Sequence, residues 1–516
     1  MPQNFIGCGR ERAFLMPPSL LEWVPEDHLV WTVLDAVAEM DLGAFYAAYR
    51  ADGHGRPAYE PAMMVALLLY AYARGNRSSR RIERACVEDV AYRVICSNLV
   101  PDHSTIAEFR VRHEDALAEL FTAVLGLCRR AGLVSVGVVA IDGTKVQANA
   151  SREANRGYER IAREMLAEAA ETDRREDELY GDARGDELPE RLRTSAGRRA
   201  ALREAKQELE RERATEHDGE ARAEAPEGVA AELDPARFVT RAHGRRAWLR
   251  EGRRALEERR AGEARPVPRS RSERLAETAR RLEEELEVEH QANAAYEAWR
   301  RRGVAADGTR RMAPGSGKPY RPPQLPAGTI NTTDPDSRLV KTVGQKAIQG
   351  YNAQAAVNEH QILVACEVTV ESPDFGHLEP MVDATERELE RAGADRPGMV
   401  IADAGYWHKR QMEDVVCRGI QVLIPPDSGL RTSARPGWDG GLYAFMRRVL
   451  STDHGKALYR KRHATIEPVF GQMKFNRRLD RFLRRGRSAA RSEWRLFGAS
   501  HNLLKLHNHR TAAAAA

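Results

Sequence analysis

Residues 134–150, VSVGVVAIDGTKVQANA, are the stretch on which the fold assignment depends. The run is apolar and rich in valine up to Ile141, which is typical of a buried strand. It is then broken by Asp142-Gly143, a dipeptide that favours tight turns. We therefore expect the first strand of an α/β domain at 131–151, between a long helical region and a long charged region.

Residues 1–130, which precede this strand, are expected to be helical. Apolar residues recur at helical spacing, for example in PAMMVALLLYAYARG (61–75). Thr105 with Glu108 fits a capping box, which predicts a helix start at that point. The region also carries clustered arginines that suit a helical DNA-binding module and a helical packing domain equally well: Arg77, Arg80, Arg81 and Arg84.

Residues 152–330, which follow the strand, are expected to be an insertion of charged helices. Of the 159 residues in 152–310, 72 are Asp, Glu, Lys or Arg, so the region has little apolar material for a core. One 4-3-4 stripe is typical of a coiled-coil face: Leu275, Ala279, Leu282 and Leu286. We predict long exposed helices, for which an antiparallel pair is one arrangement. Gly and Pro at 301–330 predict a linker.

Strand texture returns in the last part of the chain, 331–510. IQGYNAQAAVN and ILVACEVTV predict paired strands joined by a tight turn at Glu359-His360. The pattern after them predicts a helix, a strand, a helix, a strand and a basic helix, at 377–393, 398–407, 408–419, 421–426 and 454–480. With the insertion after the first strand set aside, this order is that of a ribonuclease H-like α/β fold.

Three carboxylates stand at particular places in this pattern. Asp142 follows the apolar strand VGVVAI and Asp403 follows GMVIA, and ligand sites of α/β sheets lie at the carboxyl ends of strands. Glu467 precedes Pro468, which is tolerated in the first turn of a helix, so we expect Glu467 at a helix start. Taken singly, each acid also has a structural explanation as a turn residue or a helix N-terminal residue.

Carboxylates that converge from distant segments suit one kind of chemistry. Phosphodiester cleavage needs an activated oxygen nucleophile and a stabilised leaving oxygen, and two divalent ions can supply both. Mg²⁺ prefers carboxylate oxygens among protein ligands. The sequence offers no competing His/Cys constellation, and its six cysteines form no CxxC pair, so zinc and disulfide frameworks are not indicated.

Charge and hydropathy narrow the class of partner. Residues 451–510 hold 15 Lys/Arg against 4 Asp/Glu, a net of +11 in a chain of net charge +5, which favours a polyanion partner over a merely solvated basic helix. The 516-residue chain has no run of 18 apolar residues, so we expect no membrane span. Its N-terminus is unlike a signal peptide, so we expect a cytoplasmic, nucleoid-associated protein.

Five segments, read in order, resemble the DDE transposases of bacterial insertion sequences: VVAIDGTKVQANAS, NTTDPDSRLVKT, GYNAQAAV, VIADAGYW and RHATIEPVFGQMKFNRRLDRFLRRG. The resemblance is closest to the group with an InsH-like helical N-terminal domain, whose PDHSTIAEFR segment is similar too. It covers roughly 1–150 and 331–510. It implies that Asp142, Asp403 and Glu467 bind two Mg²⁺ ions, for which Mn²⁺ would substitute.

The resemblance also implies residues that contact DNA. The family places a Tyr and a basic residue before the glutamate and a Lys seven residues after it; Lys474 fits the last position. His463 stands at the basic position, and Arg460, with Tyr459 beside it, stands where the Tyr is expected. Phosphate contacts are expected for Arg460, Arg462, His463 and Lys474. DPDSR (334–338) is expected to form a turn, with Arg338 near DNA.

The implied function is transposition: metal-dependent cleavage at transposon ends, then transfer of the freed 3′-hydroxyl into target DNA. The implied partners are the terminal inverted repeats, the target DNA and further copies of the chain, as a homodimer or larger assembly on DNA. Two alternatives stay open on the sequence, a non-transposing nuclease on the same fold and an inactive DNA-binding relic. The intact triad argues against the relic.

Overall fold

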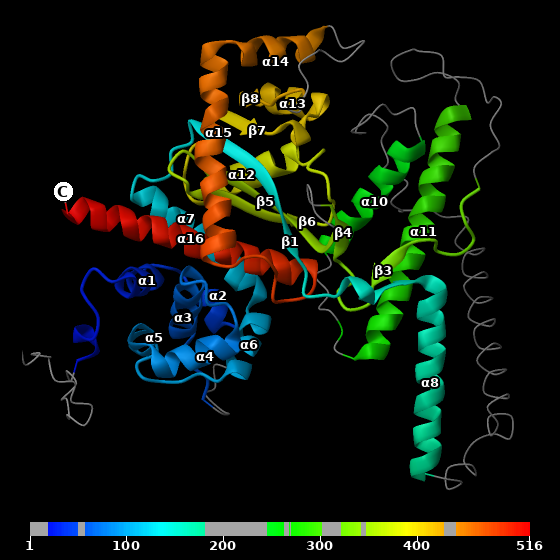
Figure 1. The fold of residues 1–516 in the computed structure, drawn as a ribbon, viewed down its shortest axis with the longest axis horizontal. Helices are drawn as coiled ribbons and strands as arrows, with labels where there is room; N and C mark the ends of the chain where they lie inside the picture. The colour runs from blue at the N-terminus through cyan, green and yellow to red at the C-terminus, as the bar shows by residue number, and fades with distance from the viewer. Residues whose placement is uncertain are drawn as a thin grey trace, which may run out of the picture. The chain divides into compact units, whose positions relative to one another are not determined.

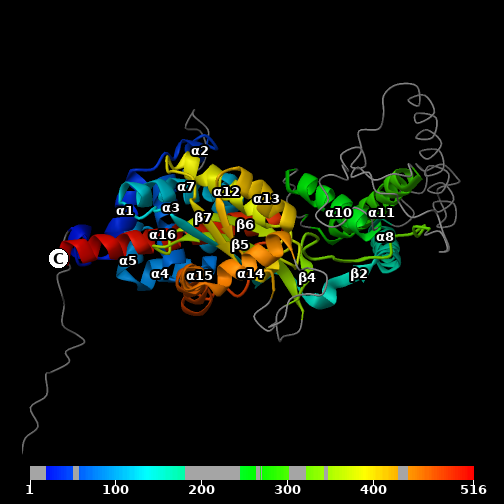
Figure 2. The same ribbon diagram turned by 90° about the horizontal axis from the view of Figure 1, so that it is seen from above.

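The computed structural model describes residues 19–49, 57–180, 245–262, 268, 270–301, 321–341, 347–427 and 440–515. The chain divides into two compact units (Figures 1 and 2). The sheet unit comprises Met1–Asn149 with Leu339–Ala516, and the inserted unit comprises Ala150–Arg338. The N-terminal residues and Cys8 lie outside the described residues, and the other five cysteines are free thiols. No described helix is long and apolar enough to cross a membrane.

The sheet unit begins with helices, as predicted: η1 (Leu20–Glu22), α1 (Leu29–Ala38), α2 (Gly43–Tyr46), α3 (Pro61–Ala73), α4 (Ser79–Glu88), α5 (Val90–Ile95), α6 (His103–Arg112) and α7 (Glu114–Arg130). The capping box predicted at Thr105 is wrong. Helix α6 starts two residues earlier because Asp102 is its N-cap, and one carboxylate oxygen accepts from the backbone N–H groups of Ser104 and Thr105 at 2.9 Å each.

Strand β1 (Val138–Gln147) lies at the centre of the sheet. It pairs antiparallel with β5 (Ile348–Asn358) over nine residue pairs and parallel with β7 (Met399–Ala402). The break predicted at Asp142-Gly143 is therefore wrong, because the strand runs straight through it. Gly143 serves close approach instead of a turn: a Cβ there would collide with the Asp374 carboxylate and with the Gln354 amide.

The remaining strands extend the sheet on both sides of β1, in the order β4-β5-β1-β7-β8. Strand β6 (Leu363–Thr369) forms the predicted hairpin with β5, β8 (Gln421–Leu423) pairs parallel with β7, and β4 is Arg338–Val340. The helices are α12 (Leu378–Arg391), η6 (Ala404–Tyr406), α13 (Lys409–Cys417), α14 (Gly441–Ser451), α15 (Asp453–Gly471), η7 (Gln472–Asn476) and α16 (Arg487–Ala515). Figure 2 shows α12 and α13 on one face of the sheet and α14 and α15 on the other. This mixed α/β arrangement is consistent with a ribonuclease H-like fold.

Helix α16 joins the N-terminal helices to the sheet, because it packs against α7, α3 and β6. Arg495 is fully buried on α16 and donates to Glu388 at 2.8 Å and to the Ala118 carbonyl at 2.9 Å. Arg77, also buried, donates to Glu493 at 2.9 Å. Arg77 is therefore a packing residue, whereas Arg80, Arg81 and Arg84 are exposed on α4.

The inserted unit contains α8 (Tyr158–Tyr180), α10 (Arg245–Gly262) and α11 (Arg271–Arg301), with η2 (Arg152–Ala154) and a small pairing of β2 (Asn155–Gly157) with β3 (Thr329–Asn331). Leu275 and Leu282, from the predicted stripe, are buried against Ile161 and Ile330. The described helices thus share small apolar cores as well as polar surface. Residues 181–244, 263–267 and 302–320 lie outside the described part of this insertion.

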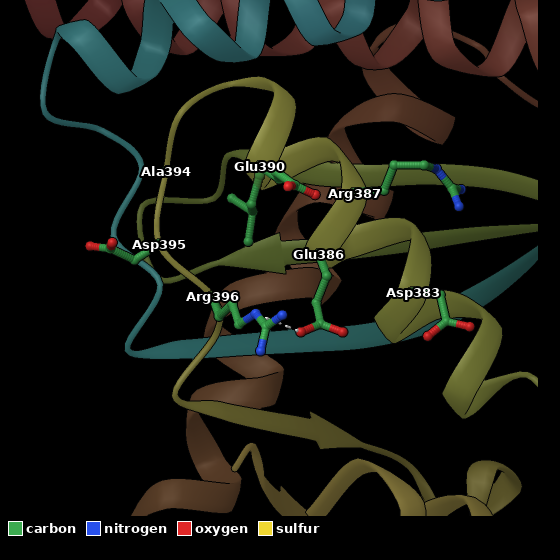
Figure 3. Close-up of a pocket in the computed structure, with 8 residues that line it drawn as sticks. Asp383, Glu386, Arg387, Glu390, Ala394, Asp395 and Arg396 are labelled. Atoms are coloured by element: carbon green, nitrogen blue, oxygen red, sulfur yellow. Dashed lines mark ion pairs between the residues drawn. The ribbon is translucent and has the colours of Figure 1, made fainter. Parts of the chain in front are cut away.

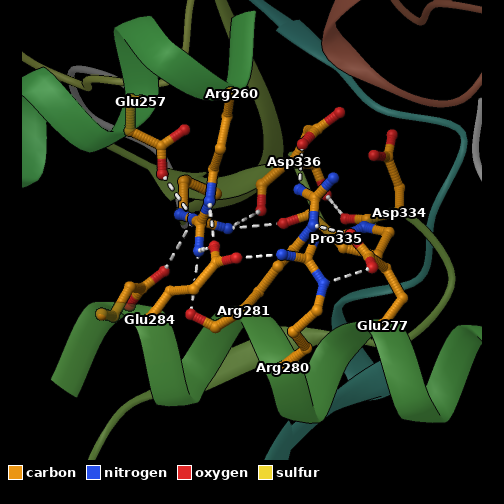
Figure 4. Close-up of polar contacts among 12 residues, drawn as sticks. Glu257, Arg260, Glu277, Arg280, Arg281, Glu284, Asp334, Pro335 and Asp336 are labelled. Atoms are coloured by element: carbon orange, nitrogen blue, oxygen red, sulfur yellow. Dashed lines mark hydrogen bonds and ion pairs between the residues drawn. The ribbon is translucent and has the colours of Figure 1, made fainter. Parts of the chain in front are cut away.

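Ion pairs hold a second part of the inserted unit together (Figure 4). Arg338 contacts Glu257 and Glu285 at 3.0 Å each, and Arg260 contacts Glu284 at 2.9 Å and Glu285 at 3.4 Å. The DPDSR segment forms the expected turn, in which the Asp334 carbonyl accepts from the Ser337 backbone at 3.1 Å. The guanidinium of Arg338 contacts two glutamates of this unit, and its expected place near DNA stays a prediction.

Helix α15 passes through Pro468, so the prediction that Glu467 lies at a helix start is wrong. The helix begins at Asp453, and Glu467 lies near its C-terminal end. Pro468 has no N–H to bond the Ala464 carbonyl one turn earlier. The Gln361 side-chain amide donates to that carbonyl at 3.0 Å, from the turn between β5 and β6. This tertiary hydrogen bond explains why the helix tolerates an internal proline.

Gln361→Ala should lower the free energy of unfolding by about 1 kcal/mol, because the Ala464 carbonyl loses its donor. In a Pro468→Ala background the backbone N–H of residue 468 can bond that carbonyl, so the same change should cost less. Denaturant unfolding of the four proteins measures this coupling. Lys505→Ala is the matched control, because it removes only the 2.6 Å bond from Lys505 to the other end of the Gln361 amide. If Gln361→Ala lowers the free energy of unfolding equally in both backgrounds, Gln361 does not replace the N–H that Pro468 lacks.

Candidate active site

Asp142 and Asp403 lie at the same edge of two neighbouring parallel strands. The last residue pair of β1 and β7 is Ile141 with Ala402, and each aspartate is the next residue along its strand. The Asp403 carboxylate accepts from the backbone N–H of Gly405 at 2.8 Å, which ends the strand and starts η6. The structure therefore brings together the two aspartates that the sequence predicts as partners.

The environment of Asp142 opposes its ionisation. Its side chain is 15% exposed. Burial raises the pKa of Asp142 to about 6, with Arg462 acting in the opposite direction and the negative charge of Asp403 adding to the rise. A divalent cation would relieve both effects, because it compensates for lost hydration and for the repulsion between the two carboxylates.

Glu467 reaches this edge from α15, which packs across β1, β5 and β7. Its carboxylate is half-exposed and lies 2.5 Å from Nδ1 of His463, one helical turn earlier. The spacing of four residues places both side chains on the same face of the helix. His463, predicted to contact DNA, is therefore also a neighbour of the third acid.

Arg462 connects α15 to the aspartates. Its Nη2 donates to Oδ2 of Asp142 at 2.6 Å, and its Nη1 lies 3.7 Å from Oε1 of Glu467. The side chain is only 9% exposed. Arg462 was predicted to contact DNA phosphate, but in this structure its guanidinium bridges two of the three predicted metal ligands.

A second polar cluster lies beside Gly143 and was missed by sequence reasoning. Oδ1 of Asp374 accepts from Lys145 at 3.1 Å and from the amides of Asn352 and Gln354 at 2.8 Å each. Gln354 in turn accepts from the buried hydroxyl of Tyr406. Asp374 thus fixes Lys145 two residues from Gly143. The position of Asp374 just after the β5–β6 hairpin, in ESPDFGH, was the signal that the sequence offered.

Lys474 lies in the π-helical turn η7, which continues α15. Its ammonium group donates to the backbone carbonyl of Lys145 at 3.1 Å, and burial, followed by the charge of Lys145, lowers its pKa. Two lysines from distant segments therefore lie at one edge of the site. Arg460 is exposed one turn from His463, and Tyr459 stacks edge-on against that histidine at 6.3 Å.

The predicted metal ligands are not gathered into a finished coordination shell. Within the described ranges, no group of three or more His, Cys, Asp or Glu side chains is arranged to hold a metal ion. The residue types still fit such an ion, because carboxylate oxygens are its preferred ligands. The Arg462 guanidinium stands between Asp142 and Glu467 as a stand-in cation.

A surface hollow at the end of α12 is a separate feature (Figure 3). Its lining is mainly charged and includes Glu386, which pairs with Arg396 at 3.3 Å. Arg418 contacts Asp383 and Glu386 from outside the lining. The hollow contains none of the predicted site residues, and arginines pair with two of its acids, Asp383 and Glu386, so we interpret it as a surface ion-pair cluster.

Asp142→Asn should stabilise the metal-free protein more at pH 7 than at pH 4. The pKa of Asp142 is about 6 in the folded chain, against an ordinary value of 3.8, so the wild type loses stability as pH rises through this interval. The side chain of Asn is neutral at every pH. The difference in free energy of unfolding between the variant and the wild type should therefore widen by about 3 kcal/mol as the pH rises through this interval. Denaturant unfolding in chelator across pH 4–8 measures it. Asp395→Asn, at an exposed position, is the control. If the difference in free energy of unfolding between Asp142→Asn and the wild type stays constant over this pH range, burial does not raise the pKa of Asp142.

Comparisons with known proteins match two parts of the chain to transposase families. Residues 18–112 match the family described as Transposase domain (DUF772), and residues 298–503 match the family described as Transposase DDE domain. The second match contains Asp403 and Glu467, whereas Asp142 lies between the two matches. Comparison with curated proteins and with solved structures gave no match. With an N-terminal transposase domain followed by a DDE domain in one chain, this protein belongs to the insertion-sequence DDE transposases, enzymes that act on DNA.

Proposed function

We propose that this transposase cuts DNA at the ends of its element and joins the freed 3′-hydroxyl to target DNA, on a ribonuclease H-like domain. Asp142, Asp403 and Glu467 would be the catalytic residues and would hold two Mg²⁺ ions, with Mn²⁺ able to replace them. The observation that carries the proposal is that Asp142, within β1, and Asp403, just after β7, each lie one residue past the last pair of these neighbouring parallel strands, while Arg462 links Asp142 to Glu467 on α15.

Divalent ions bound there would activate the attacking oxygen and stabilise the leaving oxygen of the phosphodiester. The chain's own residues prepare the edge for that role. The short β7 ends at Ala402, one residue before Asp403, so β1 has no partner in β7 beyond Ile141. Asp374 and Tyr406, with Gln354, fix the neighbouring backbone of β1 and Lys145. Nδ1 of His463 lies 2.5 Å from the Glu467 carboxylate and so helps to fix its position.

Positive charge around the site supports a DNA substrate. The 451–510 segment carries net +11, and several of its cations are exposed: Arg460, Lys461, Arg478, Arg481 and Arg485. We assign phosphate contacts to Arg460, His463 and Lys474. The exposed arginines of α4 suit recognition of the terminal inverted repeats.

The same proposal assigns roles to the remaining parts. The inserted unit would be a helical element that contacts DNA or a second copy of the chain, and the active assembly on DNA would be a homodimer or larger. The enzyme would work in the cytoplasm, on the nucleoid. The role of the inserted unit is supported by its polar surface, since its apolar residues form only small cores. The cellular location is inferred from DNA as the substrate.

Asp142→Asn, Asp403→Asn and Glu467→Gln should each reduce end cleavage at least about 1,000-fold while leaving affinity for end DNA nearly unchanged, because each removes metal-binding charge but no phosphate contact. Gel analysis of end-containing DNA with Mg²⁺ measures cleavage and strand transfer, and chelation should abolish both. Asp395→Asn is the matched exposed control.

Arg460→Ala should show the reverse pattern, with weaker DNA binding and a log–log salt slope reduced by about 0.9. Near-wild-type cleavage by any triad variant would remove that residue from the site. End cleavage without strand-transfer products would identify a nuclease instead of a transposase.

A further inference from the structure

Arg462 is the cation most closely associated with the three acids of the proposed site. It lies 2.6 Å from Asp142 and 3.7 Å from Glu467. One guanidinium therefore contacts two of the three carboxylates of the proposed site.

The position of Arg462 does not suit a phosphate contact in this conformation. Its side chain is 9% exposed, whereas Arg460, Lys461 and His463 on the same helix are exposed. The other cations of α15 can therefore meet DNA directly. Arg462 would have to leave Asp142 before it could do so.

The hydrogen bonding of Arg462 is incomplete. Its Nε is buried and has no hydrogen-bond partner among the described residues. A buried guanidinium with an unsatisfied donor is held mainly by the opposite charges around it. Another cation that offers those carboxylates more charge can replace it without breaking a full set of hydrogen bonds.

We propose that Arg462 is a built-in counter-cation, which occupies the place of a divalent ion before metal loading and competes with that ion for Asp142 and Glu467. The inference rests on the metal site of the proposed function. Metal loading then requires the guanidinium to move away, and a DNA phosphate offers it a new anion. DNA binding and metal loading should therefore promote each other.

A direct test measures Mn²⁺ binding to the full-length, DNA-free protein. The electron paramagnetic resonance signal of free Mn²⁺ reports how much of the ion remains unbound. The portion of binding that Asp142→Asn removes defines the site. Arg462→Gln should bind Mn²⁺ at that site about 10-fold more tightly than the wild type, because the competing charge is gone. Arg460→Gln is the matched control, with the same charge change at an exposed position of the same helix. It should change the affinity by less than about twofold.

Equal or weaker Mn²⁺ binding by Arg462→Gln would overturn the proposal, since it would show that the arginine orients Asp142 for the ion instead of competing with it. If neither wild type nor Arg462→Gln has an Asp142-dependent Mn²⁺ site, the metal site of the proposed function fails as well. Circular dichroism checks folding. If Arg462→Gln fails to fold, Arg462→Lys takes its place, because lysine keeps the charge on a group that makes no bidentate contact. Arg462→Lys should bind Mn²⁺ more tightly than the wild type. No increase in Mn²⁺ affinity would count against the proposal.

Discussion

The pairing of β1 with an antiparallel neighbour on one side and a parallel neighbour on the other is the constraint on which the sheet unit depends. It places Asp142 in mid-sheet, where the strand is buried, and sets Asp403 beside it at the end of β7. Because β7 is shorter than β1, β1 has no partner in β7 beyond Ile141, and among the described residues it pairs on that side again only at Gln147, which bridges to Arg481. Gly143 leaves room beside β1 for the Asp374 carboxylate, which a Cβ at this position would displace.

Much of this arrangement could be predicted from patterns that are local in the sequence. The hairpin of β5 and β6, helix α12 and strand β7 follow from periodicity and turn residues, and the aspartates follow from their places after apolar strands. Two of the errors arose where a distant residue overrides a local signal. Asp-Gly favours a turn, but β5 holds β1 straight through it. Proline favours a helix start, but the Gln361 amide satisfies the carbonyl that Pro468 leaves free.

The roles of the arginines were harder to predict for the same reason. A basic residue in a basic segment suggests a phosphate contact, yet Arg77, Arg462 and Arg495 are buried against carboxylates or carbonyl groups contributed by segments far away in the sequence. Asp374 was missed because it follows a strand by several residues and has no motif of its own. Its importance comes from three donors that only the folded sheet brings together.

The central claim is that Asp142, Asp403 and Glu467 share one metal site although they are far apart in sequence. Fe²⁺ placed in that site, with ascorbate and peroxide, would generate hydroxyl radicals that cut the polypeptide nearby. Mass spectrometry of the fragments should find cuts close to residues 142, 403 and 467 together, all suppressed by excess Mg²⁺. Cuts near one of these residues without the others, or cuts that Mg²⁺ does not suppress, would contradict a shared site.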